Sequence, residues 1–178
     1  LDEPFSSLDR ELRERLAVDV HRLVRELGIT ALLVTHDQQE AFTVADEVGV
    51  LNAGHLVQWD TPYNLYHRPA NRFVADFVGQ GVFLQGDVLN AHEVRIELGT
   101  LAGSIPTDCG VGCAACGKGC HVSVLLRPDD IVHDDTAATQ AEVVAKAFRG
   151  AEFLYTLKLP SGVRLLSLGR ASGIEAEC

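Results

Sequence analysis

A stripe of apolar residues at helical spacing runs along the first part of the chain, and the opposite face is charged. Apolar side chains that recur every three or four residues lie on one face of an α-helix. The stripe consists of Leu12, Leu16, Val20, Leu23 and Leu27. Ser7 or Asp9 can cap the start of this helix, and Gly28 can end it. The pattern therefore predicts an amphipathic helix over residues 9–27.

An apolar run follows over residues 29–35, between a glycine and a histidine. Runs of this kind are typical of a strand that is buried on both faces, as in a parallel sheet. Residues 37–45 then have the pattern of a second helix, with Asp37 well placed at its N-terminal end. Helices that alternate with a buried strand predict an α/β fold for this part of the chain.

Turn residues divide the next segment into short elements. Residues 47–51 and 55–59 are strand-like and flank Asn52-Ala53-Gly54, which indicates a β-hairpin. Two short helices are predicted after the hairpin, over residues 61–67 and 71–78.

From about residue 82 the pattern changes to short extended runs separated by turn residues. The predicted strands cover residues 82–89, 93–98, 121–126, 140–148, 153–159 and 163–168. Regularly spaced short strands indicate a small β-barrel or sandwich. The sequence therefore predicts two domains, residues 1–80 and residues 81–178.

The composition indicates a folded protein and argues against several classes of partner. Apolar residues make up 47% of the 178 residues, which is enough for a packed core. The formal net charge of −10 argues against nucleic acid or anionic lipid as the main partner, because both bind basic surfaces. No apolar stretch approaches the ~20 residues that a membrane-spanning helix needs.

Three ionisable residues have the arrangement that a nucleotide site requires. Asp2 and Glu3 are adjacent carboxylates before a turn and a helix, and His36 follows the apolar run. ATP hydrolysis needs a carboxylate that holds Mg²⁺, often through water, and a base for the attacking water. A hydrogen-bonding side chain near the γ-phosphate stabilises the transition state. Each feature alone is common by chance, but together they indicate half of a nucleotide site.

These segments resemble the ATPase subunits of ATP-binding-cassette (ABC) transporters. Residues 1–4 (Leu-Asp-Glu-Pro) look like the end of the Walker B motif, and residues 6–9 (Ser-Ser-Leu-Asp) look like the D-loop. Residues 35–41 (Thr-His-Asp-Gln-Gln-Glu-Ala) are similar to the switch-histidine region. The likeness continues without a gap to about residue 80, and it implies the C-terminal part of an ABC ATPase core.

The resemblance also implies roles for single residues. Glu3 is the implied catalytic base, and Asp2 acts on Mg²⁺ through water. His36 contacts the γ-phosphate, so the implied cofactors are ATP and Mg²⁺. Asp9 reaches across a dimer to the nucleotide site of a second ATPase subunit, and Ser7 joins it among the cofactor-binding residues.

The β-rich remainder resembles TOBE, a regulatory extension of importer ATPases with an all-β, OB-like fold. Residues 126–131 (Leu-Arg-Pro-Asp-Asp-Ile) carry most of this likeness, and residues 148–152 (Phe-Arg-Gly-Ala-Glu) add to it. The expected fold class is therefore an incomplete α/β ABC ATPase core followed by an OB-like TOBE domain.

Among such importers, residues 58–66 and 76–81 look most like the ferric-iron import group. Sulfate, polyamine and sugar importers share the architecture and stay open as alternatives. The implied partners are a second ATPase subunit in a homodimer, membrane permease subunits and, indirectly, a periplasmic substrate-binding protein. The implied location is the cytoplasmic face of the inner membrane, as a peripheral subunit.

Two motifs of complete ABC ATPases do not occur in the 178 residues: the Gly-x-x-x-x-Gly-Lys-Ser/Thr phosphate loop and the Leu-Ser-Gly-Gly-Gln signature. We therefore expect a C-terminal fragment of an ATP-hydrolysing subunit, cut before its phosphate loop and inactive by itself. The alternative is a non-catalytic protein whose β-domain has a regulatory or metal-sensing role.

Four of the five cysteines lie close together with glycines between them. They are Cys109, Cys113, Cys116 and Cys120. Four thiolates can bind Zn²⁺ tetrahedrally or hold an iron–sulfur cluster. The alternatives are a flexible loop with reduced thiols and two disulfides formed on oxidation. The spacing matches no zinc ribbon, so the sequence leaves both the presence and the identity of a metal open.

Overall fold

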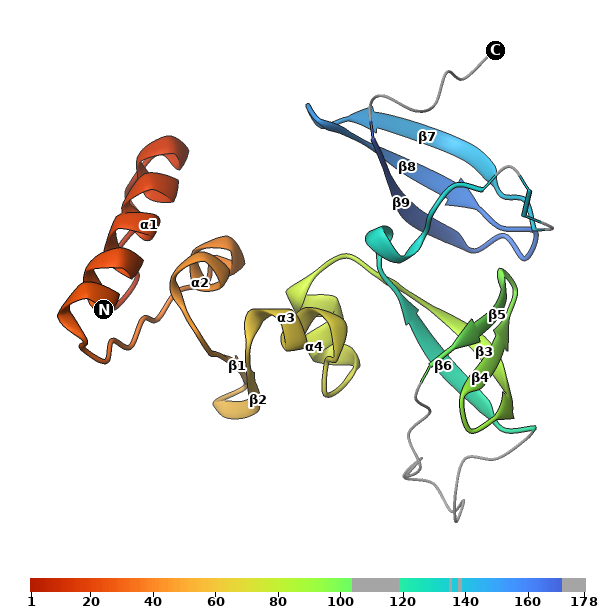
Figure 1. Ribbon diagram of the computed structural model, residues 1–178, viewed down its shortest axis with the longest axis horizontal. Coiled ribbons are helices and arrows are strands. Elements are labelled where there is room, and N and C mark those ends of the chain that lie inside the picture. Colours follow the sequence, from red (N-terminus) through yellow and green to blue (C-terminus); the bar gives the residue numbers. More distant parts are fainter. Residues whose placement is uncertain (104–118, 135, 138, 171–178) are drawn as a thin grey trace. The chain divides into compact units, whose positions relative to one another are not determined.

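The computed structural model describes residues 1–103, 119–134, 136–137 and 139–170. Contacts between residues divide the chain into two compact units, Leu1–Gly79 and Gln80–Cys178. Among the described residues, the α-helices lie in the first unit and most of the strands lie in the second (Figure 1). An α/β part followed by an all-β part is the fold class that the sequence predicts.

The helix predicted from the leucine stripe is confirmed as α1 (Arg10–Leu27). The Asp9 side chain caps it by accepting a hydrogen bond from the Leu12 backbone N–H at 3.0 Å. Gly28 ends it with a left-handed φ of 61°, a conformation that glycine adopts without a steric penalty. None of the helices in the described residues has the length and apolar character that a membrane span requires.

The apolar run over residues 29–35 does not form the buried strand that its sequence predicts. Its regular pairing is a single parallel bridge between Asp2 and Val34, and Ile29 and Leu32 are 54% and 69% exposed. A strand that is buried on both faces needs neighbouring strands and covering layers. In the described part of the chain only residues 1–3 pair with this run, so much of its apolar surface faces solvent.

The other elements predicted in the first unit are confirmed. They are α2 (Gln38–Val44), β1 (Val48–Asn52), β2 (His55–Asp60), α3 (Pro62–His67) and α4 (Arg72–Val78). Strands β1 and β2 pair antiparallel around Ala53-Gly54, where both φ angles are positive, as in a type I′ turn. A small core of Val50, Leu65, Val74 and Val78 joins the hairpin to the two short helices.

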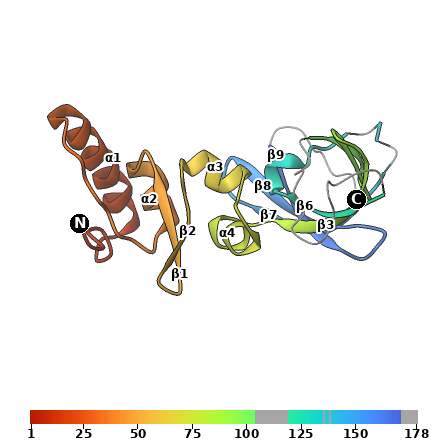
Figure 2. The ribbon, with the colours of Figure 1, turned by 90° about the horizontal axis from the view of Figure 1, so that it is seen from below.

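Two antiparallel sheets build the second unit (Figure 2). Their strand orders are β5-β4-β3-β6 and β7-β8-β9. The strands are β3 (Val82–Asn90), β4 (Glu93–Ile96), β5 (Gly99–Ala102), β6 (His121–Leu126), β7 (Glu142–Phe148), β8 (Glu152–Lys158) and β9 (Arg164–Arg170), and the short helix η1 (Pro128–Asp130) follows β6. The sequence predicts every strand except β5, whose four residues are all exposed and show no alternating pattern.

Both sheets of the second unit contribute to one apolar core. Leu84 of β3 and Ile96 of β4 belong to the same buried cluster as Leu165 of β9. Gly86 of β3 lies where this packing is tight, because a Cβ at this position would be 2.4 Å from Val94 Cγ1 and 3.1 Å from Ile96 Cγ2. The absence of a side chain at Gly86 therefore lets β4 approach β3 closely.

We expect Gly86→Ala to lower the free energy of unfolding of the second unit by about 1–3 kcal/mol, because the added methyl group overpacks the core. Urea unfolding followed by circular dichroism measures the change. Gly103→Ala is the matched control, since no atom lies within 4 Å of a Cβ built there. Equal stability of the two variants would contradict this account of the core, and Val94→Ala should partly offset the loss in the double variant.

Candidate functional site

A short parallel pairing between residues 1–3 and 32–34 brings the predicted site residues together. The Leu1 amine donates to the Leu32 carbonyl, the Val34 N–H donates to the Leu1 carbonyl, and the Glu3 N–H donates to the Val34 carbonyl, each at 2.8 Å. Both segments run in the same direction, so their carboxyl ends meet at one edge. Glu3 ends one segment, and His36 follows the other.

Glu3 and His36 form the contact at this edge. His36 Nδ1 lies 2.9 Å from Glu3 Oε1, and the side chains are 76% and 46% exposed. The hydrogen bond to Glu3 raises the pKa of His36 above its usual value, and the charge of Glu3 adds to this rise. Glu40 and Asp37 raise this pKa further through their charges. The histidine therefore lies in an acidic setting that favours its protonated form.

The backbone of Glu3 turns sharply at this point. Its φ angle is +40°, in the left-handed region that residues other than glycine rarely adopt. The Glu3 carbonyl then accepts hydrogen bonds from the backbone N–H and the hydroxyl of Ser6. The unusual φ therefore starts the turn that leads into α1 and sets the direction of the carboxylate.

The other predicted site residues lie around this pair. Asp2 is exposed, and its backbone bridges Val34. Asp9 is exposed at the start of α1, where its carboxylate serves as the N-cap, and Ser7 is exposed in the turn before it. The structure thus brings Glu3 and His36 into contact, while it uses Asp9 to begin a helix.

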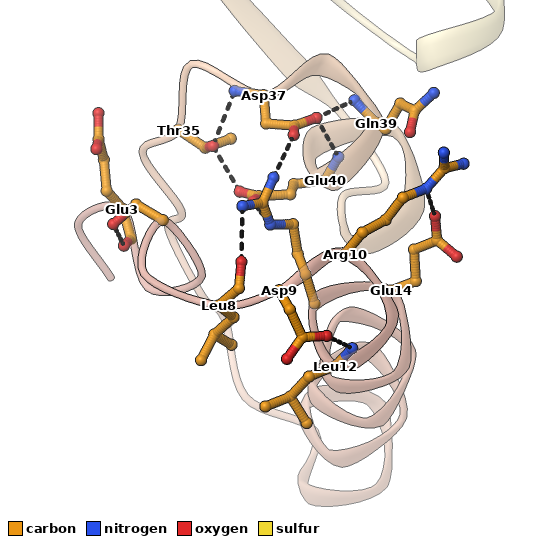
Figure 3. A network of polar contacts seen from close by, with 12 residues as sticks. Glu3, Leu8, Asp9, Arg10, Leu12, Glu14, Thr35, Asp37, Gln39 and Glu40 are labelled. Atoms are coloured by element: carbon orange, nitrogen blue, oxygen red, sulfur yellow. Dashed lines mark hydrogen bonds and ion pairs between the residues drawn. The ribbon is translucent and has the colours of Figure 1, made fainter.

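A network that sequence analysis did not identify lies beside the His36 loop. It consists of Arg13, Thr35, Asp37 and Glu40 (Figure 3). Asp37 and Glu40 have the three-residue spacing of a capping box, which is the one signal in the sequence. In the structure Asp37 caps α2, but Glu40 contacts Thr35 and Arg13 instead of the Asp37 backbone.

The predicted cysteine site falls largely outside the described residues, because Cys109, Cys113 and Cys116 are not among them. Cys120 is half-buried before β6, and its carbonyl accepts a hydrogen bond from the Val88 N–H at 2.9 Å. Within the described ranges, no group of three or more histidine, cysteine and acidic residues could hold a metal ion.

Asp2 and Glu3 fit a site for a hard divalent cation. Their carboxylates are exposed oxygen donors, which are the ligands that Mg²⁺ prefers, directly or through water. Beside them lies His36, whose pKa the hydrogen bond to Glu3 raises, and the protonated form that this rise favours suits an anionic oxygen such as that of a phosphate. The donor set is therefore chemically suited to a magnesium–nucleotide complex.

Comparison with known proteins shows the family to which this chain is related. The family model of the TOBE domain matches residues 124–175. The spermidine/putrescine import ATP-binding protein PotA of Rubrobacter xylanophilus is 36% identical over 171 residues, which cover 94% of this chain and 45% of the relative. The proteins of the same name from Marinobacter nauticus and Lawsonia intracellularis are 38% and 42% identical, over 94% and 74% of this chain.

The chain spans about half the length of the curated relatives that it matches, 45% in the Rubrobacter and Marinobacter proteins. The match includes both units, since it covers 94% of the chain. The chain therefore corresponds to the C-terminal portion of the ATP-binding subunits of ABC importers and contains a TOBE domain.

Proposed function

We propose that this chain is the part of an ABC importer's ATP-hydrolysing subunit that carries the catalytic base, the switch histidine and the TOBE domain. The contact of 2.9 Å between His36 Nδ1 and Glu3 Oε1 is the observation that carries this proposal. It joins a base to a hydrogen-bond donor at an exposed edge, as phosphoryl transfer to water requires.

In this proposal Asp2 would hold Mg²⁺ through a water molecule, and the bound ion would supply positive charge for the phosphates of the nucleotide. Glu3 accepts a proton from water as the water oxygen bonds to the γ-phosphorus and the bond to ADP breaks. His36 holds the Glu3 carboxylate through Nδ1, and its Nε2 donates a hydrogen bond to a γ-phosphate oxygen. The raised pKa of His36 supports this role, because a protonated ring donates from both nitrogens.

We infer a polyamine as the transported substrate. The similar proteins from Rubrobacter, Marinobacter and Oleidesulfovibrio are named as spermidine/putrescine import proteins. The ferric-iron substrate that residues 58–66 and 76–81 indicated gains no support from these relatives. Glu3 and His36 do not distinguish a polyamine from ferric iron, because the proposal assigns them to ATP and not to the transported molecule.

The proposed partners are a second ATPase subunit, membrane permease subunits and a periplasmic substrate-binding protein. The D-loop-like turn supports the first of these, because Ser7 and Asp9 are exposed beside the proposed nucleotide site. The proposed location is the cytoplasmic face of the inner membrane, where ATP is available.

We expect Glu3→Gln in the complete subunit that carries this chain to lower kcat for ATP hydrolysis by about a hundredfold or more, because the base is lost. His36→Ala should have a similar effect. Glu26→Gln, an equal change on the exposed face of α1, should leave turnover unchanged. The 178-residue chain alone should show no turnover, because its sequence has no phosphate loop.

Unchanged ATP turnover in a folded Glu3→Gln subunit would contradict the proposed role of Glu3. Uptake of radiolabelled spermidine by vesicles with the complete importer tests the substrate, and uptake should fall with kcat. Uptake of labelled ferric iron in place of spermidine would overturn the polyamine assignment but leave the ATPase assignment intact.

Nuclear magnetic resonance titration should give His36 a pKa above the ordinary histidine value of about 6.5, and Glu3→Gln should lower it. A raised folded-state pKa stabilises the fold below the unfolded-state pKa, and this contribution is lost as pH rises through the folded-state pKa. The stability difference between the native chain and Glu3→Gln should therefore shrink above neutral pH. A His36 pKa that is unchanged by Glu3→Gln would contradict the contact.

A second proposal concerns the four clustered cysteines, whose close clustering in the sequence supports a zinc or iron–sulfur site with a metal-sensing role. Protein purified without oxygen should then contain about one zinc ion or one cluster per chain. Replacing Cys109, Cys113, Cys116 and Cys120 together by serine should remove it, whereas Cys178→Ser should not. Four free thiols without zinc or iron would end this proposal.

A further inference from the structure

We propose that Arg13 is a positioning residue for the nucleotide site, and that it fixes the His36 loop through Asp37 and Glu40. This proposal rests on the proposed function, since it assigns the groups that hold His36 in place for ATP hydrolysis. It adds residues of α1 and α2 to a site that residues 1–3 and 36 otherwise define.

The guanidinium of Arg13 contacts three different segments. Nη1 donates to Asp37 Oδ2 at 3.1 Å, and Nη2 donates to the Leu8 carbonyl at 3.0 Å. Nε lies 3.3 Å from Glu40 Oε1, which is ion-pair distance. A rigid fork with several donors can join acceptors in this way, whereas a lysine amine has one compact charged centre. Arg13 therefore ties the D-loop-like turn to the loop and helix that follow the apolar run.

The residues on both sides of His36 are fixed by this network. Thr35 donates its hydroxyl hydrogen to Glu40 Oε2 at 2.6 Å, and the Asp37 N–H donates to Thr35 Oγ1 at 3.0 Å. Figure 3 shows Thr35, Asp37 and Glu40 gathered at the start of α2, with the Leu8 carbonyl directed towards them. The backbone around His36 is thus bound at Thr35 and at Asp37.

The burial of Glu40 distinguishes this network from ordinary surface charges. The Glu40 side chain is 4% exposed, and that of Arg13 is 29% exposed. A carboxylate in such a setting needs its charged and hydrogen-bonding partners, so loss of one partner is costly. By contrast, Arg22 on the same helix is 67% exposed and pairs with exposed Asp19 and Glu26. Arg22 is therefore a matched control for Arg13.

The position of His36 depends on this support because its own ring is 76% exposed and makes its side-chain hydrogen bond to an exposed Glu3. If Arg13 is removed, Asp37 and buried Glu40 lose their shared cation, and the loop between Thr35 and Asp37 is free to shift. A displacement of about 1 Å in a catalytic group can lower the rate by about a hundredfold. The defect should appear in kcat, because the contacts of the Arg13 side chain are with Leu8, Asp37 and Glu40, whereas the proposal assigns the chemistry to Asp2, Glu3 and His36.

The first test is kinetic and uses the complete subunit. We expect Arg13→Lys and Thr35→Val to lower kcat for ATP by about tenfold or more, with KM for ATP little changed. Thr35→Ser keeps the hydroxyl and should restore turnover, and Arg22→Gln should match the native subunit. If Arg13→Lys does not fold, the pair Thr35→Val and Thr35→Ser decides the question.

The second test uses the 178-residue chain and is independent of ATP hydrolysis. The ring-nitrogen resonances of His36 report its hydrogen bond to Glu3, so Arg13→Lys and Thr35→Val should shift them, whereas Arg22→Gln should not. The two tests can also disagree. If the complete native subunit hydrolyses no ATP but the variants of the 178-residue chain still shift the His36 resonances, the proposed function is refuted and the positioning role is supported. Native resonances and native kcat in both Arg13→Lys and Thr35→Val would overturn the positioning role.

Discussion

The pairing of residues 1–3 with residues 32–34 is the constraint on which the proposed nucleotide half-site depends. Three backbone hydrogen bonds of 2.8 Å hold the two segments parallel. A parallel connection requires a crossover, and the turn and α1 supply it. Residues that lie 33 positions apart in the sequence, Glu3 and His36, thus meet without any regular sheet around them. Arg13 then secures the crossover helix to the loop that carries the histidine.

Stability and chemistry reside in different parts of the molecule. The buried clusters around Leu65 in the first unit and Val88 in the second consist of aliphatic side chains with almost no exposure. Glu3 and His36 are exposed, and an exposed ion pair contributes little to folding. The buried cluster of the first unit lies in the hairpin and the short helices, whereas Glu3 and His36 lie outside it.

Local patterns predicted most of the fold because helices, turns and hairpins are specified by nearby residues. The leucine stripe predicted α1, and Asn52-Ala53-Gly54 predicted the β1–β2 hairpin. The prediction of a buried strand over residues 29–35 was wrong, because the burial of an apolar run depends on neighbouring strands and not on the run itself. Strand β5 was missed because its four exposed residues pair with β4 without an apolar face.

The sequence predicted the contact at the candidate site but not the groups around it. Motif spacing pointed to Asp2, Glu3 and His36 as site residues, and the structure brings Glu3 and His36 into contact; their role in catalysis stays a prediction. The contacts of Arg13 with Asp37 and Glu40 come from the packing of α1 on α2, which no local pattern encodes. The transported substrate was the weakest inference from sequence. The residues of an ATPase subunit bind nucleotide and do not contact the transported molecule, so they do not identify it.

The left-handed backbone at Glu3 has a consequence for engineering. A residue with a side chain at φ +40° carries a conformational penalty of about 1–2 kcal/mol that glycine avoids. A procedure that selects variants for thermal stability alone would therefore favour glycine at this position. The selected protein would be more stable, but it would lack the Glu3 carboxylate that contacts His36.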